Sequence, residues 1–284
     1  MSGSLRGLTP EHAARLALLV DECKPLLDRD AGMEGVQRLL RDLGVGVMDS
    51  ITVTREVLGA GSGGLAEAKD IVLSSAARST GPAAHQQPAD VAERAKDVVD
   101  GLLHSVPAPG ATRLVAIDGA GGSGKSTLAA AVAGELDGSV VVHVDDFYRP
   151  MPDREREQLD AEQGYHRYFD WGRLRDQVLV PLRDQGRAAR YQRYDWTTGR
   201  LGAWCEIAPG GVVIVEGVYA ARPELVPYYH FTVYVDTPRS TCLQRVRARG
   251  ENPEEWIRRW RDAEDHYLRT TWPQTRATLL VRGY

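Results

Sequence analysis

A glycine-rich run near the middle of the chain constrains the fold more than any other segment. Residues 119–127 read Gly-Ala-Gly-Gly-Ser-Gly-Lys-Ser-Thr, and Lys125 is the only lysine between Arg113 and Tyr284. Every other permanent cation in that stretch is arginine, so this position favours an ammonium group on a flexible stem. The run matches G-x-x-x-x-G-K-S/T, the pattern of a loop whose backbone wraps around phosphate groups.

The segments on either side supply the context that this pattern requires. Residues 113–118 form an apolar run typical of a buried parallel strand, and residues 128–136 form an alanine-rich run typical of a helix. In this order, backbone N–H groups and the helix N-terminus face the phosphates. Lys125 is predicted to bridge the β- and γ-phosphates, and the Ser126 hydroxyl to bind Mg²⁺. The residues expected to hold the triphosphate are Gly119, Gly121, Gly122, Ser123, Gly124, Lys125, Ser126 and Thr127.

The same glycines satisfy a second pattern, G-x-G-x-x-G, which is typical of dinucleotide sites. Asp145 follows at about the distance expected for a ribose-binding carboxylate, so spacing alone leaves both interpretations open. The Lys125-Ser126 pair favours the triphosphate, because a hydride-transfer site needs neither residue. A glycine-rich turn that binds neither kind of cofactor is the remaining alternative.

Composition narrows the class of protein. At 284 residues the chain has room for about two domains. Its formal charge of −4 gives no general attraction to polyanions, so nucleic acid is not an expected partner. Three scattered cysteines lack metal-ligand spacing and favour a reducing compartment without disulfides. No apolar stretch reaches about 18 residues, so we expect a cytoplasmic protein that does not enter a membrane.

One boundary is visible in the sequence. Residues 79–90 combine Gly, Pro and Gln without apolar periodicity and are predicted to be a linker. It separates a small module, residues 1–78, from a larger domain, residues 91–284. An amphipathic helix is expected over 91–106, with Asp90 as its N-cap.

Acidic residues end two further apolar runs. Residues 138–144 lead into Asp145-Asp146, and residues 212–215 lead into Glu216. Because ligands collect at the carboxyl ends of parallel strands, these carboxylates should face the phosphate loop. One Asp is expected to accept the proton of an attacking hydroxyl, and Glu216 to hold Mg²⁺ or its water. An Asp-Asp pair that only caps a turn is the alternative.

Arginines and aromatic residues follow in two other segments. Arg245, Arg247 and Arg249 are expected either to close over a triphosphate or to lie on a solvated helix face, and for residues 258–261 the solvated face is favoured. Aromatic and polar residues at 165–171 and 190–196 predict a pocket for an acceptor molecule. Any single aromatic residue there is more commonly a packing residue.

From about residue 113 to residue 284 the chain resembles the uridine kinase family of P-loop kinases, which includes pantothenate kinase and phosphoribulokinase relatives. The resemblance rests on the phosphate loop, Asp145-Asp-Phe-Tyr148, Phe169-Asp170, Tyr194-Asp-Trp196 and Glu216-Gly217. It implies that Asp145 is the general base. It implies further that the acceptor is held by Asp146, Tyr148, Asp170 and Tyr194, and that Arg245, Arg247 and Arg249 clamp the phosphates, with Arg247 acting in catalysis. Where pyrimidine nucleoside kinases carry a histidine a few residues after the Tyr-Asp-aromatic motif, this chain has Thr197-Thr-Gly199.

The N-terminal module carries a separate resemblance. Residues 51–59 and 63–72 are similar to the C-terminal domain of the bacterial ribosomal stalk protein, with a longer glycine loop at 60–63. This implies a helical module for a protein partner or for self-association; a helical appendage packed on the larger domain is the alternative.

Together these features predict an α/β protein in which helices flank a P-loop NTPase-type parallel sheet, with a small, mainly helical N-terminal module. The expected activity is transfer of the γ-phosphoryl group of ATP, with Mg²⁺, to a hydroxyl of a small metabolite, favouring the 5′-hydroxyl of a nucleoside such as uridine or cytidine. Pantothenate or another polyhydroxylated metabolite is the alternative acceptor. A non-catalytic ATP-binding regulatory protein and an NAD-dependent enzyme are the alternatives of other classes.

Overall fold

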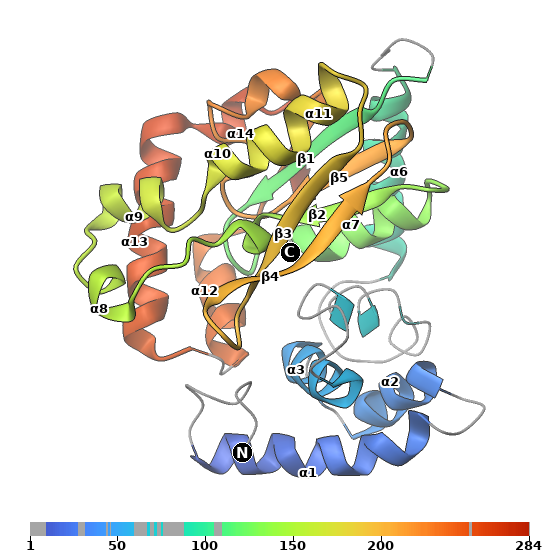
Figure 1. Ribbon diagram of the computed structural model, residues 1–284, viewed down its shortest axis with the longest axis vertical. Coiled ribbons are helices and arrows are strands. Elements are labelled where there is room, and N and C mark those ends of the chain that lie inside the picture. Colours follow the sequence, from blue (N-terminus) through green and yellow to red (C-terminus); the bar gives the residue numbers. More distant parts are fainter. Residues whose placement is uncertain are drawn as a thin grey trace.

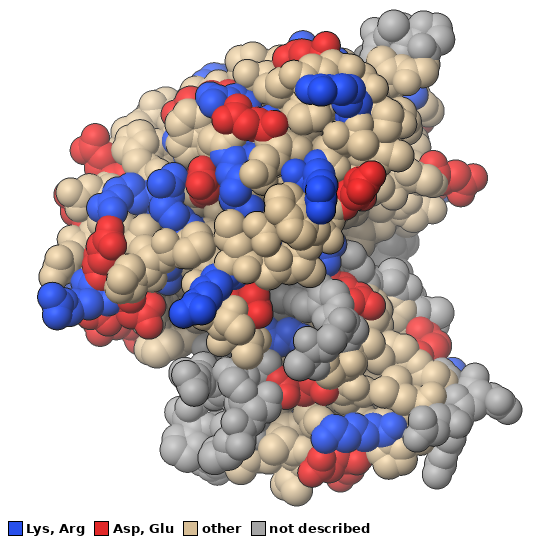
Figure 2. Space-filling view, in the orientation of Figure 1, with Lys and Arg blue, Asp and Glu red and all other residues tan. Residues whose placement is uncertain are grey.

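The computed structural model describes most of the chain. Its described residues are 10–27, 32–43, 45, 47–59, 67–68, 71–72, 75, 88–104, 110–249 and 252–283. Within these ranges, no helix combines the length and the apolar character needed to cross a membrane. Basic and acidic side chains are interspersed over the face shown in Figure 2.

A five-stranded parallel sheet forms the centre of the larger part of the chain. Its strand order is β2-β5-β1-β6-β7, and every neighbouring pair is parallel. Apolar runs form these strands because both faces of the sheet are covered, so no alternation with polar residues is needed. The strands are β1 (Arg113–Gly119), β2 (Val140–His143), β5 (Val212–Glu216), β6 (Phe231–Asp236) and β7 (Leu279–Arg282). The predicted α/β class is confirmed.

Each face of the sheet carries its own core. On one face, α6 and α7 pack through residues such as Val98, Leu102 and Val132. On the other face, short helices and a hairpin pack through residues such as Val178 and Tyr191. In Figure 1 these elements form layers in front of and behind the sheet. The elements are α6 (Pro88–His104), α7 (Lys125–Gly134), α10 (Trp171–Leu174), the π-helical turn Arg175–Leu179, α11 (Val180–Arg183), β3 (Ala189–Asp195) and β4 (Arg200–Ile207).

Most of the remaining helices lie beside the carboxyl ends of the strands (Figure 1). They are α8 (Asp153–Arg156), α9 (Ala161–Arg167), α12 (Arg239–Ala248) and α13 (Glu254–Thr271), with a 3-10 turn at Val144–Phe147. The longest of them, α13, packs against α9. By contrast, α14 (Pro273–Arg276) and a 3-10 turn at Val226–Tyr228 lead into the amino ends of β7 and β6.

The N-terminal module has a small core of its own. Its helices α1 (Pro10–Leu27), α2 (Gly32–Asp42) and α3 (Val47–Leu58) enclose Leu16, Val36, Leu40 and Val53, all 1% exposed or less. Most of the expected linker lies outside the described residues. The predicted N-cap at Asp90 is wrong, because α6 already begins at Pro88, where a proline suits the first helical turn.

Candidate active site

A cavity of about 380 Å³ opens where the carboxyl ends of β1, β2 and β5 meet α12 and α13. This volume lies within the range of pockets that bind small molecules. The phosphate loop lines one part of the cavity, and six aromatic side chains line another. The lining residues from the loop are Gly121, Gly122, Gly124, Lys125, Ser126 and Thr127, and the aromatic ones are Tyr148, Tyr168, Phe169, Trp196, Tyr219 and Trp260.

The loop takes a conformation that only glycine accepts readily. Gly122 has φ of 84°, and a Cβ atom there would lie 2.5 Å from the carbonyl oxygen of Cys242. Gly124 has φ of 96° and caps α7, whose first residue is Lys125. Positive φ values cost a side-chain-bearing residue strain that glycine avoids. Local sequence therefore sets both the tight turn and the start of the helix.

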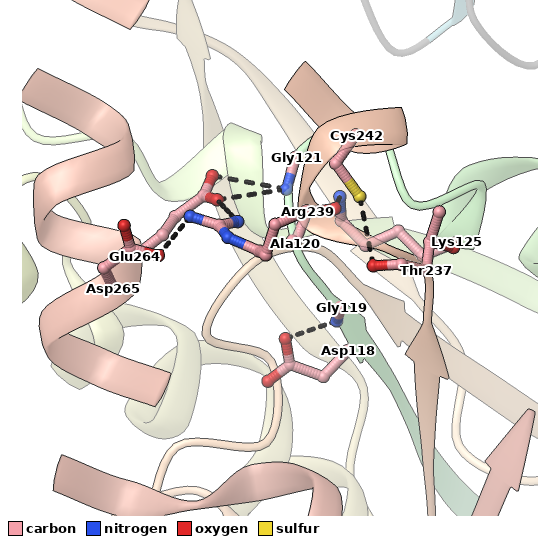
Figure 3. A network of polar contacts seen from close by, with 10 residues as sticks. All are labelled: Asp118, Gly119, Ala120, Gly121, Lys125, Thr237, Arg239, Cys242, Glu264 and Asp265. Carbon is pink, nitrogen blue, oxygen red and sulfur yellow. Dashed lines mark hydrogen bonds and ion pairs between the residues drawn. The ribbon is translucent and has the colours of Figure 1, made fainter. Parts of the chain in front are cut away.

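The lysine and the serine that follow the last glycine of the loop lie close to the loop backbone and to Glu216. The Lys125 Nζ donates to the carbonyl oxygen of Ala120 at 3.4 Å, so the ammonium lies over the loop. Figure 3 shows this lysine beside the loop backbone. The Ser126 hydroxyl donates to Glu216 Oε2 at 3.1 Å, which joins two predicted metal ligands from separate elements.

Glu216 has a buried partner that sequence reasoning missed. Its Oε1 lies 2.5 Å from His143 Nδ1, and both side chains are 3% exposed. The two residues are register partners on the adjacent strands β2 and β5. A signal existed in the sequence, because His143 immediately precedes the strand end that carries the Asp-Asp pair. His143 fixes the orientation of the carboxylate.

The oxygen donors at this place fit Mg²⁺. Ser126 and Glu216 supply a hydroxyl and a carboxylate, the hard ligands that this ion prefers. Among the described residues, there is no cluster of three or more His, Cys, Asp or Glu side chains that could hold a metal ion. Mg²⁺ usually takes one or two protein ligands together with phosphate oxygens and water, so this small donor set is sufficient.

The two adjacent aspartates have different environments. Asp145 is partly exposed and lines the cavity. Asp146 is 6% exposed and does not line it, because the 3-10 turn directs its carboxylate to the hairpin. There it accepts from the Tyr191 hydroxyl at 3.2 Å and pairs with Arg193 at 3.5 Å. The structure therefore places Asp146 in a packing role rather than at the predicted acceptor site.

Tyr148 is the centre of the aromatic wall. It stacks on Trp196 with ring centroids 4.6 Å apart, and its edge contacts with Phe169 and Tyr194 measure 5.2 Å each. Burial raises the pKa of Tyr148, so its phenol is neutral at ordinary pH. Its buried hydroxyl makes no hydrogen bond of ordinary geometry among the described residues, although the nearby Trp260 indole N–H lowers this pKa in part. Trp196 and the Arg156 guanidinium, 4.4 Å from the ring centre, cover Tyr148, so the surface that suits a ligand ring is formed by the partly exposed Phe169, Trp196 and Trp260.

Two residues expected to bind the acceptor lie away from the cavity lining. Asp170 caps α10 by accepting from the backbone N–H of Arg173 at 3.1 Å, and it pairs with Arg149 at 3.5 Å. Tyr194 packs behind Tyr148 and is 8% exposed. Their neighbours in the chain, Phe169 and Trp196, take the lining positions instead.

Only some of the arginines of α12 and α13 line the cavity, and the sequence did not indicate which ones. Arg249 lines the cavity, whereas Arg245 donates to the carbonyl oxygen of Gly122 at 3.2 Å from outside it. Arg247 is half-exposed and pairs with Glu254 at the surface, so it does not reach the cavity. Arg261, assigned to a solvated face, lines the cavity. Helical periodicity explains why Arg247 differs from Arg245 and Arg249, because residues two apart lie on roughly opposite sides of a helix whereas residues four apart share a side.

One carboxylate from α13 and one from the end of β1 hold the loop in place (Figure 3). Glu264 accepts from the backbone N–H of Gly121 at 3.2 Å and from Arg239 at 3.0 Å. Asp118 accepts from the N–H of Gly119 at 2.6 Å and is fully buried. Burial raises the pKa of Asp118 to about 6.

Comparisons with known proteins agree with this geometry. Residues 114–281 match the model of the Phosphoribulokinase / Uridine kinase family. The uridine kinase of Ureaplasma urealyticum is 28% identical over 161 residues, which cover 52% of this chain and 76% of that protein. The uridine kinase of Vibrio cholerae is 27% identical over 166 residues, with shares of 52% and 76%. A structure described as a possible uridine kinase from Bacillus stearothermophilus shares the fold, with a TM-score of 0.52 at 23% identity over 66% of this chain and 98% of that one.

Proposed function

Because the chain belongs to the Phosphoribulokinase / Uridine kinase family, we propose that it transfers the γ-phosphoryl group of ATP to a hydroxyl of a small metabolite. The proposed acceptor is the 5′-hydroxyl of a nucleoside such as uridine or cytidine, as in the relatives named uridine kinase. One observation carries the proposal: a single cavity joins the phosphate loop, the Asp145 carboxylate and an aromatic wall. ATP and the acceptor molecule would therefore bind next to each other in this cavity.

The donor is held by the loop and by cations around it. Backbone N–H groups at the start of α7 and the Lys125 ammonium bind the β- and γ-phosphates. Arg249 and Arg261 contribute positive charge from the facing helices. Ser126 and Glu216 would hold Mg²⁺, which would neutralise charge on the phosphate oxygens.

The acceptor is held against the wall built around Tyr148. A ring stacks on the partly exposed faces of Phe169, Trp196 or Trp260, because Tyr148 itself is covered by Trp196 and Arg156. Asp145, next to this wall in the chain, accepts the proton of the attacking hydroxyl. The hydroxyl oxygen then forms a bond to the γ-phosphorus. The bond from that phosphorus to the β–γ bridging oxygen breaks, and ADP leaves.

The first test replaces the proposed base. Asp145→Asn keeps the shape of the side chain and removes its basicity, so ATP binding should stay within about threefold while turnover falls by about two orders of magnitude or more. Calorimetry with ATP and a coupled assay of ADP release measure the two quantities. Asp170→Asn is the matched control, because asparagine also caps helices, and its turnover and acceptor KM should stay within about threefold. Equal turnover in both variants would move the base elsewhere.

The second test identifies the acceptor. The wild-type chain is incubated with radiolabelled ATP and a panel of nucleosides, pantothenate and sugars, and labelled products are separated. We expect labelled nucleoside 5′-monophosphate. A labelled product from pantothenate or a sugar alone would overturn the nucleoside assignment, while ATP binding without any labelled product would favour a regulatory ATP-binding protein.

A further inference from the structure

A helix of the N-terminal module forms part of the wall of the same cavity. Ile51, Thr52 and Arg55 of α3 line it together with Lys125 and the glycines of the phosphate loop. In Figure 1, α3 lies beside the end of α12, the helix that lines the cavity through Leu243 and other residues. The three α3 residues are spaced i, i+1 and i+4, so they lie on one side of the helix.

The opposite side of α3 is fixed inside the module. Val53 and Val57 belong to the core that α3 shares with α1 and α2. Thr54 is fully buried and accepts a hydrogen bond from Gln37 of α2 at 2.7 Å. A buried polar pair of this kind resists rotation of the helix, because rotation would break its hydrogen bond. The side of α3 that carries Arg55 is therefore held toward the cavity.

The charge of the lining favours a polyanion. Among the described residues, five basic and three acidic side chains line the cavity, and Arg55 is one of the five. Another of the five, Arg239, is paired with Glu264 and Asp265. Two of the acidic side chains, Asp145 and Glu216, lie on the side where Mg²⁺ would balance them. A triphosphate is the ligand whose charge matches this excess of arginine and lysine.

We propose that the N-terminal module completes the donor site and that Arg55 binds the phosphate chain of ATP. This rests on the proposed function only in taking ATP as the donor. The planar guanidinium forms charge-assisted hydrogen bonds to phosphate oxygens, and Thr52, one turn away on the same side, adds a hydroxyl. The module also covers the cavity from the side of α12, which keeps water from the reacting phosphate.

Binding of ATP to the full-length chain tests the proposal without any acceptor. Arg55→Ala should weaken the dissociation constant for ATP, measured by calorimetry with Mg²⁺ present, by about tenfold or more. Arg55→Lys keeps the charge and should recover part of that loss. Arg38→Ala, which removes the same charge from the exposed side of α2, should bind ATP within about twofold of wild type. The rise in melting temperature that ATP produces should also be smaller for Arg55→Ala than for wild type, each measured from its own ligand-free value.

The outcomes separate this inference from the proposed function. Equal ATP affinity in Arg55→Ala and Arg38→Ala would overturn the inference, and so would tighter ATP binding in Arg55→Ala, which would indicate a module that obstructs the site. A tenfold loss of ATP affinity supports it even if no acceptor in the panel is phosphorylated. Normal phosphorylation of an acceptor by Arg55→Ala with unchanged ATP affinity would leave the kinase assignment intact and refute the role of Arg55.

Discussion

The hydroxyl of Tyr267 makes a hydrogen bond whose strength should depend on pH. It donates to Asp118 Oδ2 at 2.6 Å, and the same oxygen accepts from the backbone N–H of Ala221 at 2.8 Å. Asp118 is fully buried directly before the phosphate loop, and burial raises its pKa from 3.8 to about 6. The change Tyr267→Phe removes one of the hydrogen-bond donors that stabilise the ionised form of this buried carboxylate.

The magnitude follows from the pKa. A rise of about two units corresponds to about 3 kcal/mol of free energy between the protonated and ionised forms of Asp118. Because the folded-state pKa is above the unfolded one, this contribution to stability is fully present below about pH 4 and is lost as pH rises through about 6. Tyr267→Phe raises the pKa of Asp118 further, so its cost grows with pH. We expect about 1 kcal/mol at pH 5, where the acceptor is neutral, and about 2–3 kcal/mol at pH 8, where it is charged.

Denaturant unfolding of the wild type and the variant between pH 5 and pH 8, followed by tryptophan fluorescence, measures this difference. The control is Tyr229→Phe, because the buried Tyr229 hydroxyl has no hydrogen-bond partner among the described residues. Its removal should change the unfolding free energy by less than about 0.5 kcal/mol at every pH. A cost for Tyr267→Phe that does not vary with pH, or that equals the cost of the control, would refute the assigned role of Asp118.

Two further predictions concern the phosphate loop and the basic residues around it. Gly122→Ala should lower ATP affinity by about tenfold or more, because φ at Gly122 is positive and an added Cβ would meet a backbone carbonyl of α12. Gly134→Ala is the control: an added Cβ there has no other atom of the described residues within 4 Å, so this change should stabilise α7 by about 0.5–1 kcal/mol. Arg249→Ala should lower kcat/KM by about tenfold or more, while the surface-paired Arg247→Ala should stay within about twofold. Calorimetry, thermal unfolding and steady-state kinetics measure these effects; reversed ranking within either pair contradicts the assignment.

Strands β1, β2 and β5 and the phosphate loop were predictable because the signals are local. An apolar run, a glycine turn and an alanine-rich helix each depend on residues that are neighbours in the chain, and β1, the loop and α7 occur where the sequence places them. The Ser126 and Glu216 contact was also accessible, since carboxyl ends of parallel strands meet at one edge. The match to a kinase family favours the triphosphate over the dinucleotide interpretation of the glycines.

Side-chain direction was not predictable where it depends on helical phase. Asp145 and Asp146 are adjacent, yet a 3-10 turn sends one to the cavity and the other to the hairpin. The sequence motif contains both aspartates but does not show that a 3-10 turn directs them to different sides. The role of Arg55 was equally hidden, because the apolar pattern of α3 accounts for its packing on α1 and α2 but does not say which surface its other side meets.

The helix α13 connects the donor and acceptor sides of the cavity through one of its faces. Trp260 belongs to the aromatic wall, Glu264 accepts from the phosphate loop at Gly121, and Tyr267 donates to Asp118 beneath that loop. These positions are spaced i, i+4 and i+7, the spacing of residues stacked along one side of a helix. The opposite side is solvated, which agrees with the expectation for Arg258 but not with that for Arg261, which lines the cavity. What the sequence pattern could not indicate is that the buried side of this helix meets a cavity as well as a core. A shift of α13 would therefore move the aromatic wall and the loop together, which couples acceptor position to donor position through a single rigid element.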